Sequence, residues 1–167
     1  MIVDLGGGSG RLLERVLERW PGARVVIVDQ SQAFLDLAAV RLARFIDRTS
    51  FVCQRLQDAW SDRLSEPAAA VVSMSAIHHL DPAEKQACYQ RCFDVLQPGG
   101  VLLNGDEVRP ESEGEYRQCV EQWAAHMEGL IAASSVTPAM AEGLRKWKLR
   151  NVDQFGQPRV SGDDCHE

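Results

Sequence analysis

The residues with the clearest chemical potential lie at the start of the chain, where an acidic residue precedes a glycine-rich turn. Asp4 follows the apolar pair Ile2-Val3, and an amphipathic run over residues 11–17 follows the turn. The turn itself contains four glycines, Gly6, Gly7, Gly8 and Gly10. Glycine permits positive φ and has no side chain to collide with a ligand. A strand, a glycine turn and a helix in this order predict backbone that approaches a nucleotide-like ligand.

The spacing of the glycines narrows the kind of nucleotide site. The dinucleotide fingerprint G-x-G-x-x-G/A would place a small residue where this chain has Arg11. A phosphate-binding P-loop needs a lysine after its last glycine, and none follows Gly10. The pattern present is D-x-G-x-G-x-G, from Asp4 to Gly10. A tight strand–helix turn in some other α/β protein is the structural alternative.

A second acid ends the β-branched run over residues 24–28. Asp29 lies about 20 residues or a little more beyond the glycine turn, where Rossmann-like folds place an acid that accepts from the ribose hydroxyls. The alternative is a helix N-cap or a surface acid. Ser31 could serve as the cap instead, which would free Asp29.

Two further groups follow later strands. Asp58-Ala59 lies in the loop after residues 50–54, although a lone Asp in a loop is commonly a solvated turn residue. His78 and His79 follow the apolar stretch 69–75. Histidine titrates near neutral pH and can therefore accept or donate a proton.

Hydrophobic periodicity predicts an α/β fold with a mainly parallel sheet of about five strands and a C-terminal helical segment. The strands are expected at residues 1–5, 24–29, 50–54, 69–75 and 101–104. The helices are expected at residues 10–20, 32–45, 82–97, 112–134 and 138–149. Asp81, Pro82 and Glu84 predict a capped start for the third helix. The expected domains are a core at 1–110, a helical cap or dimerisation segment at 111–150 and a flexible tail at 151–167.

These motifs, in this order, resemble class I S-adenosylmethionine-dependent methyltransferases. The stretch from Ser73 to Leu80 is similar to the family's fourth motif, and Leu96-Gln97-Pro98-Gly99-Gly100 is similar to its L-x-P-G-G entry into strand five. The resemblance implies a Rossmann-like doubly wound sheet. It also implies S-adenosyl-L-methionine as cofactor, with Asp4 near the methionine amino group, Asp29 at the ribose and Asp58-Ala59 at the adenine. The cofactor-binding residues expected are Asp4, Gly6, Gly7, Gly8, Gly10, Asp29, Gln30, Asp58, Ala59, Ser73 and Ser75.

Methyl transfer is an in-line displacement, so the protein mainly positions donor and acceptor and excludes water. A general base is needed only if the acceptor must lose a proton. His78 and His79 are candidates, although either could instead hold the loop. Glu107 is a further candidate for orienting the acceptor, and Asp106 and His166 are weaker ones.

The chain departs from the family's seven-stranded sheet. No candidate for the last two strands follows Val108, and the usual helix before the first strand is absent, so a core truncated at both ends is expected. The strand at 101–104 would then be an apolar edge. A homodimer could form through that edge or through helices 112–149.

Composition limits the partners. A formal net charge of −6 disfavours a nucleic-acid binder, which needs a basic face, and leaves a neutral or cationic small-molecule substrate. Five cysteines without a dense framework suggest free thiols in a reducing compartment. Cys88 and Cys92 lack further ligands for a metal site. No membrane span or signal peptide is evident, so a cytoplasmic protein is expected.

The sequence therefore favours a methyltransferase that uses S-adenosylmethionine and acts on a small molecule. The first alternative is a module that binds S-adenosylmethionine without turnover and serves in interaction or regulation. The second is an NAD(P)-dependent oxidoreductase, against which Arg11 in the fingerprint argues.

Overall fold

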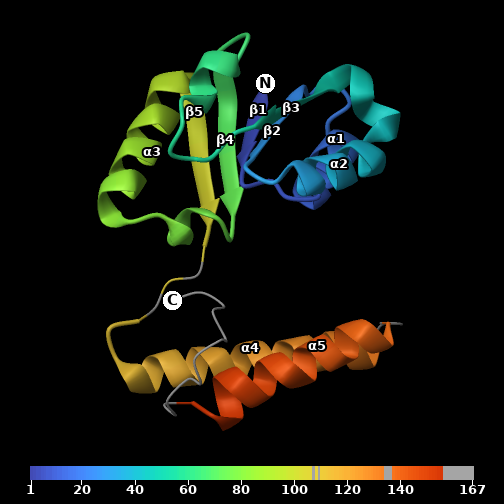
Figure 1. Cartoon of the computed structure of the whole chain (residues 1–167), viewed down its shortest axis with the longest axis vertical. Helices are drawn as coiled ribbons and strands as arrows, with labels where there is room; N and C mark the ends of the chain where they lie inside the picture. Colours follow the sequence, from blue (N-terminus) through green and yellow to red (C-terminus); the bar gives the residue numbers. More distant parts are fainter. Residues whose placement is uncertain (107, 109, 134–136, 156–167) are drawn as a thin grey trace. The chain divides into compact units, whose positions relative to one another are not determined.

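The computed structural model describes residues 1–106, 108, 110–133 and 137–155. Within them, five parallel strands form one sheet in the order β3-β2-β1-β4-β5 (Figure 1). The strands are β1 (Ile2–Leu5), β2 (Val25–Asp29), β3 (Thr49–Cys53), β4 (Ala68–Met74) and β5 (Leu96–Gly105). The chain winds outward from β1 in both directions, so a switch point lies between β1 and β4, where open α/β sheets bind ligands. The doubly wound fold predicted from the sequence is confirmed.

The sheet is buried on both faces, and β2 shows how the sequence achieves this. Val25 and Ile27 belong to one buried apolar cluster, whereas Val26 and Val28 belong to the other. Successive side chains of a strand point to opposite faces, so a continuous β-branched run fills two cores at once. Each of these four side chains is at most 5% exposed.

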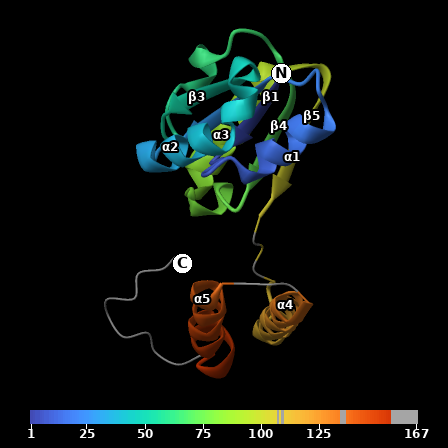
Figure 2. The same cartoon turned by 90° about the vertical axis from the view of Figure 1, so that its right-hand side faces the viewer.

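Helices cover the two faces. α1 (Arg11–Arg19) and α2 (Gln32–Arg41) pack on one face, with Leu13, Leu17 and Leu35 in the core there. α3 (Pro82–Val95) packs on the other face through Cys88 and Cys92. Figures 1 and 2 show α3 on the opposite side of the sheet from α1 and α2.

Two element boundaries differ from the predicted ones. α2 ends at Arg41 and a 3₁₀ segment, Ala43–Arg48, replaces its expected last turn, because Phe45 has non-helical dihedrals (φ −121°, ψ 15°). β5 begins at Leu96 rather than at residue 101, and its register against β4 shifts between Ala68 and Ala70. An edge strand tolerates the proline and glycines of this segment, since one side needs no ladder hydrogen bonds.

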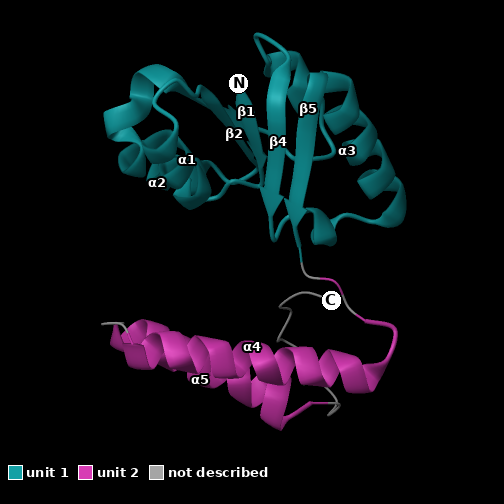
Figure 3. Cartoon of the chain, turned by 180° about the vertical axis from the view of Figure 1, so that it is seen from behind, with its two compact units in different colours: residues 1–107 teal, residues 108–167 magenta. Residues whose placement is uncertain are grey.

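The second compact unit, Val108–Glu167, follows the first, Met1–Glu107 (Figure 3). It contains α4 (Glu113–Ala133), α5 (Pro138–Lys148) and a π-helical turn over Leu149–Asp153, which lies where the flexible tail was expected to begin. Nζ of Lys148 lies 2.6 Å from a carboxylate oxygen of Glu128 and links the two helices. Among the described residues, none after Gly105 is in a strand, and none of the helices is long and apolar enough to span a bilayer.

The start of α3 fixes the loop that carries the two histidines. Asp81 is the N-cap: its Oδ1 accepts from the Glu84 backbone N–H at 2.8 Å, and the Glu84 side chain accepts from the Asp81 N–H at 3.0 Å. Pro82 occupies the first turn, where no N–H is needed. The predicted capping box is confirmed.

We expect Asp81→Ala to lower the free energy of unfolding by about 1 kcal/mol, because the first turn of α3 loses its side-chain acceptor. Urea denaturation followed by circular dichroism measures this change. Asp81→Asn, which keeps a capping oxygen, should retain most of the stability. Equal losses in the two variants would show that the cap hydrogen bond is not what stabilises this turn.

Candidate functional site

The glycine turn follows the carboxyl end of β1. It is crowded at Gly6 and open at Gly8. Gly6 has φ +68°, and a Cβ there would lie 2.3 Å from the Cβ of Ala76, in the loop after β4. Gly8 has φ +50°, and a Cβ there would meet nothing within 4 Å. The turn therefore packs tightly against the β4 loop at Gly6 and is open at Gly8, where a ligand can approach the backbone.

Asp4 lies beneath this turn with a buried carboxylate. The residue is 1% exposed, and none of the described residues donates a hydrogen bond to its Oδ2. A Cβ on Gly7 would lie only 2.9 Å from that oxygen, so the backbone of the turn rests against the carboxylate. A buried acceptor without a donor is costly and indicates a missing partner.

The electrostatic environment of Asp4 favours a cationic partner. Burial, and then the nearby negative charge of Asp29, raise the pKa of Asp4 to about 7. A cation beside this carboxylate would supply the missing donor and offset the repulsion between the two acids. An ammonium group fits this requirement, because it is positively charged and carries three donors.

Asp29 is the last residue of β2, and its carboxylate binds the backbone of the glycine turn. The Gly8 N–H donates to its Oδ2 at 2.9 Å, and the Ser31 N–H donates to its Oδ1 at 2.8 Å. Ser31 caps α2 by accepting from the Phe34 N–H at 3.3 Å, as expected, but this does not leave Asp29 free. Each carboxylate oxygen has capacity for a further donor, so the two bonds are compatible with a diol ligand.

Three further residues predicted at the cofactor site, Ser73, Ser75 and Gln30, also lie at strand ends, but their burial and hydrogen bonds differ from one another. The Ser73 hydroxyl is buried and donates to the Leu5 carbonyl at 3.0 Å, so its side chain joins β4 to β1. Ser75 is exposed, has φ 51°, and donates its N–H to Gly105 at 3.0 Å. Gln30 is also exposed, and its carbonyl accepts from the Cys53 thiol at 3.7 Å.

The Asp58-Ala59 pair lies in an exposed turn after β3. Oδ2 of Asp58 accepts from the Arg55 N–H at 3.2 Å, so the carboxylate closes its own turn. Ala59 precedes a short 3₁₀ helix, Trp60–Arg63, whose Trp60 is fully buried. The structure thus brings Asp4 and Asp29 together, whereas Asp58 contacts its own loop. Its role at the adenine stays a prediction.

The histidine pair lies in a 3₁₀ turn, Ile77–His79, directly after β4. The rings of His78 and His79 are 3.9 Å apart between centroids. Nδ1 of His78 lies 2.5 Å from Oδ1 of Asp106, which follows β5. Parallel neighbouring strands end at the same edge, so β4 and β5 place these two groups together. Glu107 and His166 lie outside the described residues.

Sequence reasoning missed two contacts that support the site. Nε of Arg41, on α2, donates to the Ser9 carbonyl in the glycine turn at 2.9 Å. Asn104, on β5, donates to Asp106 at 3.4 Å. Neither residue belongs to a motif. The sequence offers only the alternating polar and apolar residues of β5 and the basic residue at the end of α2. Neither feature specifies a hydrogen-bond partner.

The profile of a family described as a methyltransferase domain matches residues 2–100. The chain belongs to this methyltransferase family. Its fold and the family together make it a class I S-adenosylmethionine-dependent methyltransferase domain, as the sequence predicted. The cofactor of the family is S-adenosylmethionine.

Relatives and solved structures show how broad this family is. The methyltransferase domain is 30% identical over 115 residues to the carboxy-S-adenosyl-L-methionine synthase of Aeromonas salmonicida strain A449, covering 67% of this chain and 45% of that protein. It is 31% identical over 102 residues to a 23S rRNA (guanine(748)-N(1))-methyltransferase of Streptomyces fradiae, covering 61% and 31%. The chain thus spans less than half the length of either relative.

A solved structure gives the comparison with bound ligands. It is an O-methyltransferase from neocarzinostatin biosynthesis in complex with S-adenosylmethionine and 2-hydroxy-5-methyl naphthoic acid. The similarity has a TM-score of 0.52 at 28% identity and covers 61% of this chain and 31% of that one. The chemistry of these residues is compatible with that cofactor, because Oδ2 of Asp4 has no donor among the described residues, an ammonium could supply one, and a Cβ on Gly8 would meet nothing within 4 Å.

The raised pKa of Asp4 predicts a pH-dependent stability. The folded carboxyl keeps its proton up to about pH 7, whereas the unfolded one releases it near 3.8. The folded state therefore binds more protons in this window, and the contribution of Asp4 to stability is fully present below the unfolded pKa. As pH rises from the unfolded pKa to the folded pKa, this contribution is lost, and the free energy of unfolding falls by up to about 4 kcal/mol.

Urea denaturation between pH 4.5 and 7.5 tests this dependence. Asp4→Asn has no titrating group there, so its stability relative to the wild type should rise across the window and level off above pH 7. Asp36→Asn, at an exposed position on α2, should follow the wild-type curve. A constant difference between Asp4→Asn and wild type would contradict a perturbed Asp4.

Proposed function

We propose that this chain provides the cofactor-binding part of an enzyme that transfers a methyl group from S-adenosylmethionine to a small-molecule acceptor by in-line displacement. The observation that carries the proposal is the buried Oδ2 of Asp4, which has no donor among the described residues and lies under the glycine turn. Such a group fits the methionine ammonium of the cofactor better than it fits a phosphate or a nicotinamide dinucleotide.

Each part of the cofactor has a matching group at the strand ends. Asp4 would hold the ammonium, and Asp29 would accept from the ribose hydroxyls with the lone pairs that Gly8 and Ser31 leave available. Asp58-Ala59 would contact the adenine, as the motif order implies. Bound in this way, S-adenosylmethionine supplies an electrophilic methyl group. The protein supplies position and exclusion of water.

A small-molecule acceptor is supported by charge. Recognition of an RNA backbone needs a basic face, whereas this chain has a formal net charge of −6. The structure from neocarzinostatin biosynthesis holds a small aromatic acid together with S-adenosylmethionine, although the Streptomyces fradiae relative is named for action on rRNA. His78, His79 and Glu107 are the proposed residues on the acceptor side.

Binding of S-adenosylmethionine should strengthen as pH rises from about 5.5 to about 7, where the α-ammonium of the ligand stays protonated. An ammonium beside Asp4 lowers the carboxyl pKa from its raised value of about 7, so the complex releases a proton that the free protein holds. Isothermal titration calorimetry in two buffers with different ionisation enthalpies measures this release near pH 6.5. Asp4→Asn should bind at least about tenfold more weakly, and with no proton release. Affinity that does not depend on pH would argue against Asp4 as the ammonium site.

Asp29→Ala should weaken S-adenosylmethionine and S-adenosylhomocysteine together by about 10- to 100-fold, because it removes a charged acceptor from the ribose and the anchor of Gly8. Calorimetry on folded protein, checked by circular dichroism, gives both affinities. Asp36→Ala is the matched control and should bind normally. Retained affinity in Asp29→Ala would reject the ribose role.

Turnover is tested with S-adenosylmethionine labelled in the methyl group, incubated with the protein and a metabolite fraction or purified rRNA. Label in small molecules is the expected result. Label only in rRNA would overturn the acceptor class. Binding without label in either fraction would favour a module without turnover. Tight NADH binding in place of S-adenosylmethionine would overturn the cofactor assignment.

A further inference from the structure

A chain of hydrogen bonds runs from His78 away from the cofactor residues. The carboxylate of Asp106 is the first link: Oδ2 accepts from the His78 backbone N–H at 2.9 Å, and Oδ1 lies 2.5 Å from Nδ1 of the His78 ring. One carboxylate thus holds both the backbone and the ring of the same residue. This double contact fixes the ring relative to the end of β4.

Asn104 and Tyr89 extend the chain of hydrogen bonds from β5 to α3. Nδ2 of Asn104 donates to Oδ2 of Asp106 at 3.4 Å and to the Tyr89 hydroxyl at 3.1 Å. An amide nitrogen has two protons, and these two acceptors use both. The Asp106 carboxylate, which only accepts, fixes which end of the Asn104 amide faces it, because a reversed amide would place its oxygen against the carboxylate. The Tyr89 hydroxyl accepts the second proton of the same nitrogen and ties Asn104 to α3.

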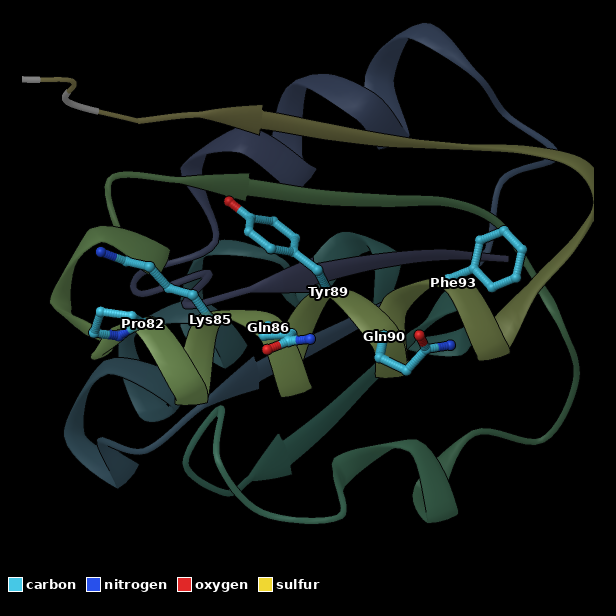
Figure 4. Close-up of a pocket in the computed structure, with 6 residues that line it drawn as sticks. All are labelled: Pro82, Lys85, Gln86, Tyr89, Gln90 and Phe93. Atoms are coloured by element: carbon cyan, nitrogen blue, oxygen red, sulfur yellow. The ribbon is translucent and has the colours of Figure 1, made fainter.

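Tyr89 lies on the outward side of α3, in a shallow hollow of that helix. Figure 4 shows its phenol ring extending from α3, in the same row as the side chains of Lys85 and Phe93. The four-residue chain His78–Asp106–Asn104–Tyr89 thus joins the turn after β4 to β5 and to α3. None of these links was required by the fold, since β4 and β5 already pair through their backbones.

We propose that Asp106, Asn104 and Tyr89 position His78 as a general base whose Nε2 accepts the proton of a hydroxyl-bearing acceptor. The proposal rests on the proposed methyl transfer and names its acceptor class. His78 is the catalytic residue. Asp106, Asn104 and Tyr89 are positioning residues, because they act through the His78 ring.

The carboxylate determines the tautomer of His78. Burial raises the pKa of Asp106, but hydrogen bonds from His78 and Asn104 outweigh burial and leave that pKa below its ordinary value. An ionised carboxylate accepts only, so Nδ1 must carry the proton that it shares. The neutral ring then has its lone pair on Nε2, as a general base requires. The other titratable ring in contact with His78 is that of His79, at 3.9 Å between centroids.

The class of methyl acceptor follows from which acceptors need a base to remove a proton. A carboxylate acceptor is already ionised at neutral pH and gains nothing from a base, whereas a phenol, with a pKa of about 10, keeps its proton. In the transfer, the oxygen–methyl bond forms as the methyl–sulfur bond breaks, and sulfur keeps that electron pair. The hydroxyl proton passes to Nε2, and Asp106 stabilises the resulting imidazolium.

Nitrogen-15 NMR of the ligand-free, histidine-labelled protein tests the positioning without turnover. The chain has four histidines, and His78→Gln identifies the His78 signals by their loss. The wild type should show His78 protonated on Nδ1 at pH 7.5 to 8. A ring protonated on Nε2 in the wild type would overturn the proposal.

Asp106→Asn should reverse the tautomer. Its amide oxygen must still accept from the His78 backbone N–H, so its NH₂ faces Nδ1, which then becomes an acceptor. Asn104→Leu and Tyr89→Phe keep the Asp106 carboxylate and should therefore leave His78 protonated on Nδ1. Gln86→Ala, on the same helix face but outside the chain of hydrogen bonds, is the matched control and should leave the spectrum unchanged. An unchanged His78 spectrum in Asp106→Asn would also overturn the proposal.

Kinetics with labelled S-adenosylmethionine then test the base and the acceptor class. With a phenolic acceptor, Asp106→Asn and His78→Gln should lower kcat by about 10²- to 10³-fold while the Kd for S-adenosylmethionine changes less than twofold. Raising the pH toward the acceptor's own pKa should recover much of the loss. Asn104→Leu and Tyr89→Phe should lose about three- to tenfold, and Gln86→Ala nothing.

The outcomes separate the two claims. Transfer to hydroxyls with kcat intact in Asp106→Asn and His78→Gln would overturn this proposal and leave the proposed function standing. Methyl transfer only to carboxylate acceptors would also overturn the base role of His78 and leave the proposed function standing. Absence of any transfer, with S-adenosylmethionine bound, would overturn the proposed function and the base role together, and the wild-type tautomer would then report on positioning alone.

Discussion

The site depends on the burial of two carboxylates under one glycine turn. Asp4 is 1% exposed, and no residue in the described part of the chain donates to its Oδ2, while Asp29 restrains the same turn through the Gly8 N–H. Burial of Asp4, and then repulsion from the nearby Asp29, raise the pKa of Asp4, and this shift expresses the cost of keeping the carboxylate there. Proteins retain such costs where a ligand relieves them. A cation that reaches Asp4 would turn an unfavourable feature of the free protein into a favourable one of the complex.

The sheet order explains how these acids meet. β1 and β2 are adjacent and parallel, so their carboxyl ends place Asp4 and Asp29 at one edge. β4 and β5, on the other side of β1, bring His78 and Asp106 to that same edge. The winding of the chain thus puts the proposed cation site on one side of the switch point and the proposed proton acceptor on the other. This arrangement suits a reaction in which a positively charged donor meets an acceptor that loses a proton.

Much of this could be predicted from the sequence, because strand ends and glycine turns leave local signals. Asp4, the glycines, Asp29 and the Asp81 capping box could each be located from residue type and spacing, and the β-branched run of β2 indicated a sheet buried on both faces. The hydrogen bonds from Asn104 to Tyr89 and from Arg41 to Ser9 could not, since they join residues 15 and 32 positions apart whose pairing depends on register and helix rotation. The early start of β5 was missed for a related reason: only its position at the sheet edge makes Pro98 acceptable in a strand.

The central claim is that Asp4 recognises the ammonium group of S-adenosylmethionine. Carbon-13 NMR of the Asp4 carboxyl, titrated against pH in the free protein and in the complex with S-adenosylhomocysteine, measures it most directly, because this product carries the same ammonium and is not consumed. The account predicts a pKa of about 7 in the free protein and a markedly lower value in the complex. An Asp4 that titrates identically in both states would contradict it.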